Sequence, residues 1–174
     1  MVYFISDAHL GSRALTSMRT RERRLVKFLD SIKHKASAVY MLGDMFDFWF
    51  EYHNVVPKGF TRFLGKVAEL TDMGVEVHLF VGNHDLWCKH YLTEECGVIM
   101  HHEPMTVDIE GKLFYLGHGD GLGDPDRKFQ LLRWVFHNRF CQWLFAGVPP
   151  RIGLELGLEW AKHSRLKHER EGAP

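Results

Sequence analysis

The sequence has few cysteines and no excess of either charge. Its three cysteines, Cys88, Cys96 and Cys141, are odd in number and form no CxxC pair, so we expect reduced thiols and neither a disulfide framework nor a thiolate zinc site. The 22 basic and 22 acidic side chains cancel. A nonspecific nucleic-acid binder needs a broad positive field, and this balance removes it. We therefore expect no nucleic-acid partner.

The sequence also lacks a membrane span and an export signal. The most apolar stretch, residues 129–148, is interrupted by arginine, histidine, asparagine and glutamine and is too polar to cross a bilayer, which takes roughly 20 apolar residues. The amino terminus runs directly into VYFISDAHL without a basic segment or cleavage site. We expect a cytoplasmic protein whose mature chain starts near Met1 and which can still touch a membrane surface.

What is present is a composition typical of one globular domain. The chain has 174 residues, of which 45% are hydrophobic and 25% are charged. Its 12 histidines exceed ordinary usage. Because imidazole is a common metal ligand, this excess favours metal chemistry.

Hydrophobic periodicity predicts alternating strands and helices in the first half of the chain. Apolar runs at 2–5, 38–42 and 75–81 are typical of buried strands, and helical spacing appears over 17–34 and 60–74. This order predicts an α/β fold with a mostly parallel sheet. A hairpin follows at 106–109 and 113–116, and residues 128–168 read as helices broken near 147–150. His101 and His102, just before the hairpin, are expected on the surface.

Four of the predicted strands end in side chains that bind metal ions in other proteins. Mixed oxygen and imidazole sets suit manganese, zinc, magnesium and iron. Any one group also fits a turn or a helix cap, which is the ordinary role of Asp and Asn after a strand. Four groups in order favour a catalytic metal site. In chain order they are Asp7 and His9; Asp44 and Asp47; Asn83, His84 and Asp85; His118 and Asp120.

The series SDAHLG, GDMFD, VGNHD and GHGD resembles the calcineurin-like metallophosphoesterases over about residues 1–126. Within that superfamily, FDFWF, GDGLGDPD and the helical segment after them look most like the UDP-2,3-diacylglucosamine pyrophosphatases of lipid A synthesis. The resemblance implies an αββα sandwich with a helical lid insertion. Residues 1–127 would form the N-terminal part of the core, and residues 128–174 would form the lid.

The resemblance also implies two divalent metal ions, expected to be Mn²⁺. Asp7 and His9 would hold one ion, Asn83 and His118 would hold the other, and Asp44 would bridge both. Such a pair of ions can activate water and stabilise an in-line phosphoryl displacement.

His84 and Asp47 are the expected catalytic residues. In the superfamily, the histidine of the NHD motif contacts the phosphate or the leaving group and is oriented by a carboxylate, so we predict a hydrogen bond between the Asp47 carboxylate and His84. That bond would favour imidazolium. The lipid A enzymes often carry arginine at this position, which leaves open whether His84 donates a proton or balances charge. Alternatively, Asp47 caps the turn that follows it.

Apolar side chains between residues 129 and 145 lie on more than one face of a helix, which fits either a lid for acyl chains or a buried core helix. By resemblance, Asp126, Ser164 and Arg165 would contact the glucosamine. The expected partners are a lipid-linked UDP-sugar substrate and the inner membrane, at which the protein would be peripheral.

The sequence departs from the superfamily at its end. The later Gly-His-x-His motif, which gives one ligand to each metal, is missing before Pro174. We therefore expect a fragment without the C-terminal strands, whose uncovered sheet invites a dimer or a domain swap. The expected reaction is hydrolysis of UDP-2,3-diacylglucosamine to UMP and 2,3-diacylglucosamine 1-phosphate. The alternatives are a soluble phosphodiesterase or phosphatase of the same fold and a non-catalytic scaffold, and the fragment itself could be inactive.

Overall fold

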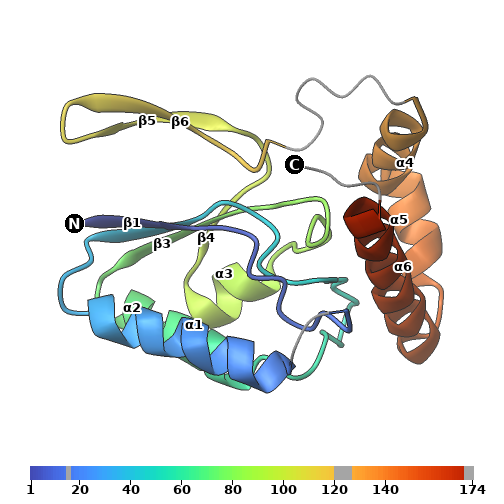
Figure 1. Ribbon diagram of the computed structural model, residues 1–174, viewed down its shortest axis with the longest axis horizontal. Coiled ribbons are helices and arrows are strands. Elements are labelled where there is room, and N and C mark those ends of the chain that lie inside the picture. The colour runs from blue at the N-terminus through green and yellow to red at the C-terminus, as the bar shows by residue number, and fades with distance from the viewer. Residues whose placement is uncertain (15–16, 120–126, 171–174) are drawn as a thin grey trace.

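The computed structural model describes residues 1–14, 17–119 and 127–170. Strands and helices alternate through the first half of the chain, then a hairpin precedes three helices (Figure 1). The elements are β1 (Val2–Ile5), α1 (Met18–Ile32), β2 (Ala38–Met41), α2 (Thr61–Asp72), β3 (Glu76–Phe80), α3 (Tyr91–Cys96), β4 (Ile99–His101), β5 (Met105–Ile109), β6 (Lys112–Leu116), α4 (Arg127–His137), α5 (Arg139–Ala146) and α6 (Pro150–Arg170).

Strands β1 to β4 form a parallel sheet in chain order, which confirms the predicted α/β fold. Val39 in the centre of β2 pairs with Tyr3 of β1 on one side and with Val77 of β3 on the other. In Figure 1 the strands run from the side of the amino terminus toward α4–α6. The carboxyl ends of the parallel strands therefore all face these three helices, and the polar residues that follow the strands meet there.

The two faces of the parallel sheet are covered differently. Helices α1 and α2 lie on one face (Figure 1), and α2 buries Phe63, Val67 and Leu70 at helical spacing in the main core. The β5–β6 hairpin lies over the opposite face, where Leu116 is buried with Tyr40 and Phe80. The hairpin delivers its own C-terminal end to the same edge of the molecule as the parallel strands.

Strand β4 corrects one sequence-based expectation. His101 is the last residue of β4 and is half-buried, whereas His102 is exposed as expected. The ring of His101 stacks on Phe80 at 4.6 Å between centroids. Its Nε2 atom lies 3.0 Å from Nδ1 of His78 on the neighbouring strand. Periodicity misses β4 because a three-residue strand is too short to show alternation.

Two carboxylates serve as remote helix caps. Glu22 on α1 is buried and accepts hydrogen bonds from the backbone N–H groups of Arg62 and Phe63 at the start of α2. Glu51 accepts the backbone N–H groups of three consecutive residues, 89–91, where α3 begins. Helix starts leave N–H groups without partners, so these contacts compensate both the helix ends and the carboxylates.

Helices α4–α6 pack against an aromatic cluster at the carboxyl edge of the sheet. The cluster consists of Phe48, Phe50, Tyr52 and Trp87, with Phe136, Phe145, Leu154 and Leu158 from the helices. Gly153 and Gly157 let α6 approach closely, because a Cβ atom at either position would collide with Tyr52 or Phe48. Other apolar side chains of these helices are exposed, so the segment is neither a wholly buried core helix nor a polar surface.

Within the described residues, no helix has the length and apolar character to cross a membrane.

Candidate metal centre

The loops after β1, β2, β3 and β6 bring the predicted metal ligands together around Asp44. The Oδ2 atom of Asp44 lies 3.7 Å from Nε2 of His9 and 3.5 Å from Nε2 of His118. Asp7 Oδ1 lies 3.7 Å from His9 Nε2, and Asn83 Oδ1 lies 3.2 Å from His118 Nε2. Five side chains from four loops therefore present oxygen and nitrogen atoms to one region.

These atoms fall into two groups that share Asp44. One group contains His9, Asp44 and His84, and the other contains Asp7, Asp44 and His118; within each group the possible ligand atoms lie within 4.8 Å of one another. A single carboxylate common to two ligand groups is the arrangement expected of a bridging ligand. Asp7 lies in the group of His118, and the group of His9 includes His84. Asp7 also lies beside His9, so the pairing of Asp7 with His9 on one ion stays a prediction.

Two of the histidines are oriented by backbone carbonyls. The Nδ1–H of His118 donates to the carbonyl oxygen of Leu42 at 2.9 Å, and the Nδ1–H of His84 donates to the carbonyl oxygen of Asp47 at 2.8 Å. Because a carbonyl oxygen only accepts, each Nδ1 carries the proton in its bond. The Nε2 atom of each ring is then left as the potential metal ligand, as in known histidine–metal sites.

The contact of His84 corrects the predicted hydrogen bond. Asp47 holds His84 through its backbone carbonyl and not through its carboxylate. The carboxylate Oδ1 lies 2.7 Å from Nη2 of Arg165 and 3.5 Å from Nδ1 of His9. The argument that a carboxylate partner favours imidazolium at His84 therefore does not apply. Nor is the carboxylate seen to cap the following turn, since its contacts are Arg165 and His9.

The backbone is strained at three of the expected ligands. Asp7, His9 and Asp44 have φ angles of 54°, 42° and 53°, in the left-handed region that favours glycine. Each such residue costs on the order of 1–3 kcal/mol and persists only where the surroundings fix it. Here, hydrogen bonds between the loops fix these conformations. The backbone N–H of His9 donates to the carbonyl oxygen of Asp44 at 2.9 Å, and that of Leu10 donates to the carbonyl oxygen of Met45 at 2.8 Å. Strain concentrated on ligand residues indicates a functional site.

Asp85 supports the loop that carries Asp44, a role that its sequence position did not reveal. Its side chain is fully buried, and its two oxygens accept the backbone N–H groups of Gly82, Asp44, Met45 and Phe46 at 2.7 to 3.3 Å. Burial and the negative charge of Asp44 raise the pKa of Asp85 to about 6, against the lowering effect of the N–H groups. The NHD motif marks Asp85 as a candidate functional residue, but nothing in the motif distinguishes a metal ligand from a residue that supports the loop.

Two glycines make room for the central side chains. A Cβ atom on Gly43, whose φ is +91°, would lie 2.5 Å from Nδ1 of His118. A Cβ atom on Gly82 would overlap the carboxylate of Asp44 and lie 2.6 Å from its backbone nitrogen. The glycines that precede Asp44 and Asn83 are therefore required by close approach and not only by the turn.

The charge distribution of the centre suits a cation. Burial alone would lower the pKa of His118, but Asp44 and the Leu42 carbonyl, with a contribution from Asp7, raise it to about 9. Burial would raise the pKa of Asp44, yet the neighbouring His118 and His84 lower it on balance. The carboxylates thus attract positive charge to the position that Nε2 of His118 faces. Carboxylate and amide oxygens with imidazole nitrogens fit a divalent ion such as manganese or zinc.

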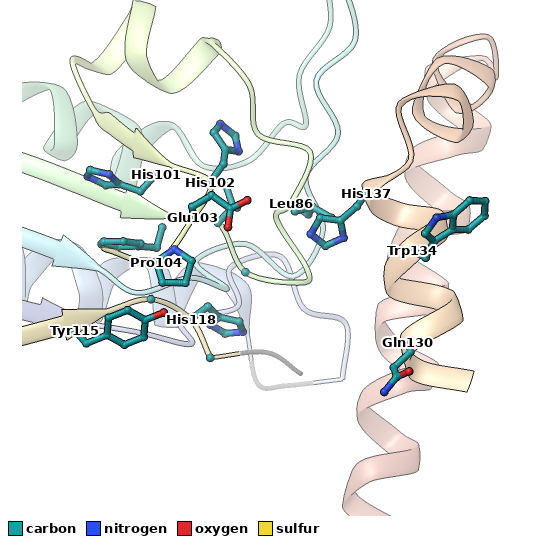
Figure 2. A pocket seen from close by; sticks show the side chains of 15 residues that line it. Leu86, His101, His102, Glu103, Pro104, Tyr115, His118, Gln130, Trp134 and His137 are labelled. Atoms are coloured by element: carbon teal, nitrogen blue, oxygen red, sulfur yellow. The ribbon is translucent and has the colours of Figure 1, made fainter. Parts of the chain in front are cut away.

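A cavity of about 600 Å³ opens beside His118, a volume usual for ligand sites. One wall is formed by the segment from His101 to Pro104 and by Tyr115, and the facing wall includes Gln130 and His137 of α4. Figure 2 shows His118 on the sheet side and α4 across the opening. Of the five proposed ligands, His118 lines this cavity, so its side of the candidate centre faces the space between the core and the helices.

Of the three residues expected to contact the glucosamine, the structure describes two. Arg165 lies on α6 and reaches the centre through Asp47. Ser164 is half-buried next to it on the same helix. Asp126 lies outside the described residues, as does Asp120.

The chain is similar to a known protein family and to several known proteins. The family model for calcineurin-like phosphoesterases matches residues 1–166. The chain is 50% identical over 174 residues to a UDP-2,3-diacylglucosamine hydrolase of Porphyromonas gingivalis, covering 98% of this chain and 64% of the relative. Proteins of the same name from Edwardsiella ictaluri and Actinobacillus succinogenes are 30% and 31% identical, covering 93% and 97% of this chain and 61% and 68% of theirs.

The chain thus spans less than two thirds of the length of the first two relatives. Its match to the family model nevertheless includes all four loops of the candidate centre. The chain belongs to the calcineurin-like phosphoesterase family.

Proposed function

We propose that this chain forms the catalytic centre of a metal-dependent hydrolase that cleaves the pyrophosphate of UDP-2,3-diacylglucosamine, giving UMP and 2,3-diacylglucosamine 1-phosphate. The observation that carries the reaction class is the position of Asp44 in both ligand groups. The names of the similar proteins support the substrate.

We propose that Asp7, His9, Asp44, Asn83 and His118 hold two divalent cations, Mn²⁺ in the first instance. Two such cations would lower the pKa of a bound water and stabilise negative charge on the phosphate undergoing attack. The protein's own contribution is orientation. The Leu42 carbonyl fixes the His118 ring, and the inter-loop hydrogen bonds hold Asp7, His9 and Asp44 in their strained conformations.

His84 is the proposed catalytic contact to the phosphate or the leaving group. Its Nδ1–H is engaged by the Asp47 carbonyl, and its backbone N–H donates to Oδ1 of Asp44 at 3.0 Å. These two bonds fix the ring beside the shared carboxylate. Asp47 acts from the other side, through its carboxylate, on His9 and Arg165.

The helices α4–α6 are the proposed lid of an αββα sandwich, in which the β5–β6 hairpin belongs to the second sheet. A small apolar pocket lined by Phe48, Trp87, Phe136 and Trp160 lies directly beside His84. The indole N–H of Trp87 donates to the carbonyl of Phe136 on α4 at 2.8 Å, which fastens the lid to the core. The pocket, of about 20 Å³, is too small for an acyl chain, but it places apolar side chains of α4 and α6 next to His84. Ser164 and Asp126 remain proposed contacts to the glucosamine.

The lid surface also supports peripheral membrane contact. Phe140 and Trp143 of α5 are 64% and 68% exposed and stack on each other at 5.9 Å between centroids. The exposed Arg139 and Arg151 lie on the same group of helices. Exposed aromatic side chains beside basic ones are typical of surfaces that bind anionic membranes.

One observation favours a soluble substrate instead. The cavity beside His118 is lined partly by histidines and by Glu103, and such a polar opening would admit a small phosphodiester as readily as a lipid. This alternative keeps the same metal centre and reaction class.

Metal content and turnover test the proposal together. The 174-residue chain and its Asp44→Asn and Asp7→Asn variants would be assayed for bound Mn²⁺ and for hydrolysis of the diacylated UDP-sugar and of a chromogenic diester. We expect Asp44→Asn to weaken both manganese equivalents and Asp7→Asn to weaken one. Equal turnover of the two substrates would favour the soluble alternative, and a chain that binds no divalent ion would rule out the proposed centre.

A further inference from the structure

A buried ion pair joins the lid to the metal centre. Nη2 of Arg165, on α6, lies 2.7 Å from Oδ1 of Asp47, in the loop after β2. The Asp47 side chain is 0% exposed and that of Arg165 is 17% exposed. A carboxylate buried to this degree requires a partner, and a charged hydrogen bond of this length is the strong kind.

The same carboxylate oxygen faces a proposed metal ligand. Oδ1 of Asp47 lies 3.5 Å from Nδ1 of His9, an electrostatic contact and not a hydrogen bond, since this Nδ1 has no hydrogen-bond partner among the described residues. The other ring nitrogen, Nε2, faces Asp7 and Asp44. In metal sites, a carboxylate behind the ring of a ligating histidine sets the orientation and the basicity of that ring. A series of contacts therefore connects the lid helix to the proposed centre, from Arg165 through Asp47 to His9.

Two other basic side chains lie near the Asp47 carboxylate, those of Arg21 and His84, but they form their hydrogen bonds with other groups. Burial lowers the pKa of Arg21 and the negative charge of Asp47 acts against this, but the Arg21 guanidinium donates its hydrogen bonds to the carbonyl oxygens of Ala8, His9 and Ser12. His84 bonds to the backbone carbonyl of Asp47 and not to its carboxylate. Within the described residues, the second carboxylate oxygen, Oδ2, has no hydrogen-bond partner. One hydrogen bond from Arg165 thus holds the Asp47 carboxylate in place.

We infer that Arg165 is a positioning residue of the metal centre: by binding Asp47 it fixes His9 and thereby strengthens cation binding. This inference rests on the proposed metal centre and assigns Arg165 a role other than contact with the sugar. The lid helix is then a structural part of the centre and not only a cover for the substrate.

A second link between α6 and the core supplies a matched control. Arg13 forms ion pairs with Glu155 and Glu159 of α6 at 2.8 and 3.0 Å. These contacts fasten the same helix but do not involve Asp47. Loss of Arg13 therefore tests general docking of the helix, whereas loss of Arg165 tests docking together with support of His9.

The experiment measures Mn²⁺ affinity by electron paramagnetic resonance for the unmodified chain and for Arg165→Gln, Arg165→Lys, Asp47→Asn, Arg13→Gln and the Arg165→Gln/Asp47→Asn double variant. Changes behind a histidine ligand typically weaken metal binding by about 10- to 100-fold. We expect a loss of this size in one manganese equivalent for Arg165→Gln and Asp47→Asn. Arg165→Lys should recover part of the loss, and Arg13→Gln should bind as the unmodified chain does.

The double variant keeps the test valid if a lone buried carboxylate disturbs folding, because it removes both charges; circular dichroism would check each fold. We expect the double variant to bind no more weakly than Asp47→Asn alone. Unchanged affinity in Arg165→Gln with a raised KM would overturn the inference and return Arg165 to substrate contact. If the chain binds no Mn²⁺, the proposed metal centre is wrong. If it binds Mn²⁺ without hydrolysing the diacylated UDP-sugar, only the substrate assignment is wrong, and the affinities of the variants still test the role of Arg165.

Discussion

Asp85 lies beneath Asp44 and accepts its backbone N–H at 3.3 Å, while binding the N–H groups of the next two residues with its other oxygen. The conformation of Asp44, with φ of 53°, is therefore held by a side chain from the following strand end. Support and ligand come from adjacent strands of one parallel sheet. Their relationship explains how Asp44, the proposed bridging ligand, stays in its strained conformation.

Asp85→Ala should destabilise the protein and its metal centre together. Four backbone N–H groups would lose their acceptor, and at roughly 1 kcal/mol for each lost hydrogen bond we expect a loss of about 3–4 kcal/mol in the free energy of unfolding. Urea denaturation followed by circular dichroism measures it. Asp72→Ala on the exposed end of α2 is the control and should change the value by less than about 0.5 kcal/mol. Similar losses in both variants would contradict the role of Asp85.

Gly82→Ala should remove cation binding at both positions. Its backbone does not lie in the left-handed region, so alanine is compatible with its φ angle. The added methyl would nevertheless lie 2.6 Å from the backbone nitrogen of Asp44 and overlap the carboxylate, so Asp44 must move. We expect at least a tenfold loss of affinity for both manganese equivalents, measured by isothermal titration, because both share Asp44.

The control is Gly65→Ala on α2, where nothing lies within 4 Å of the added Cβ. Replacing an unhindered glycine in a helix by alanine should raise the free energy of unfolding by about 0.5–1 kcal/mol and leave metal binding unchanged. Retention of both metal equivalents by Gly82→Ala would show that the Asp44 carboxylate can move without loss.

The sequence could predict that the proposed ligand residues lie near one another, because each one follows an apolar strand, where a polar residue is conspicuous. The side-chain contacts of Asp47 could not be predicted in the same way. Its partner Arg165 lies 118 positions along the chain, on a helix whose docking depends on Gly153 and Gly157. Only the fold decides which carboxylate oxygen faces which imidazole.

The carboxylates that cap backbone N–H groups were also invisible in the sequence. Glu22, Glu51 and Asp85 all accept backbone N–H groups from other elements, at separations of 38 to 41 residues. In the sequence Glu22 looks like an ordinary charge on an amphipathic helix. The short elements α3 and β4, of six and three residues, fall below the length at which periodicity can be recognised.

Gly153→Ala should loosen the lid, and Tyr52→Phe should restore it. The added methyl would collide with the hydroxyl of Tyr52, which is buried and has no hydrogen-bond partner in the described structure. Overpacking of this kind typically costs about 1–3 kcal/mol. Removing the hydroxyl relieves the collision, and Tyr52→Phe alone should be neutral or stabilising because it removes an unsatisfied polar group. Thermal unfolding of both single variants and the double variant measures the coupling; strictly additive effects would show that α6 is not seated on Tyr52.

Trp143→Ala should weaken membrane binding if α5 faces the lipid. Withdrawing a buried aromatic side chain from the interface costs about 1.5–3 kcal/mol, so we expect at least a tenfold loss in binding to vesicles containing anionic lipid, measured by flotation. Leu113→Ala on the β5–β6 hairpin is the matched control, because Leu113 is 76% exposed and thus as accessible as Trp143. High salt should weaken binding of the unmodified chain through the basic residues of the helices. An equal loss in the two variants would place the membrane contact elsewhere or make it nonspecific.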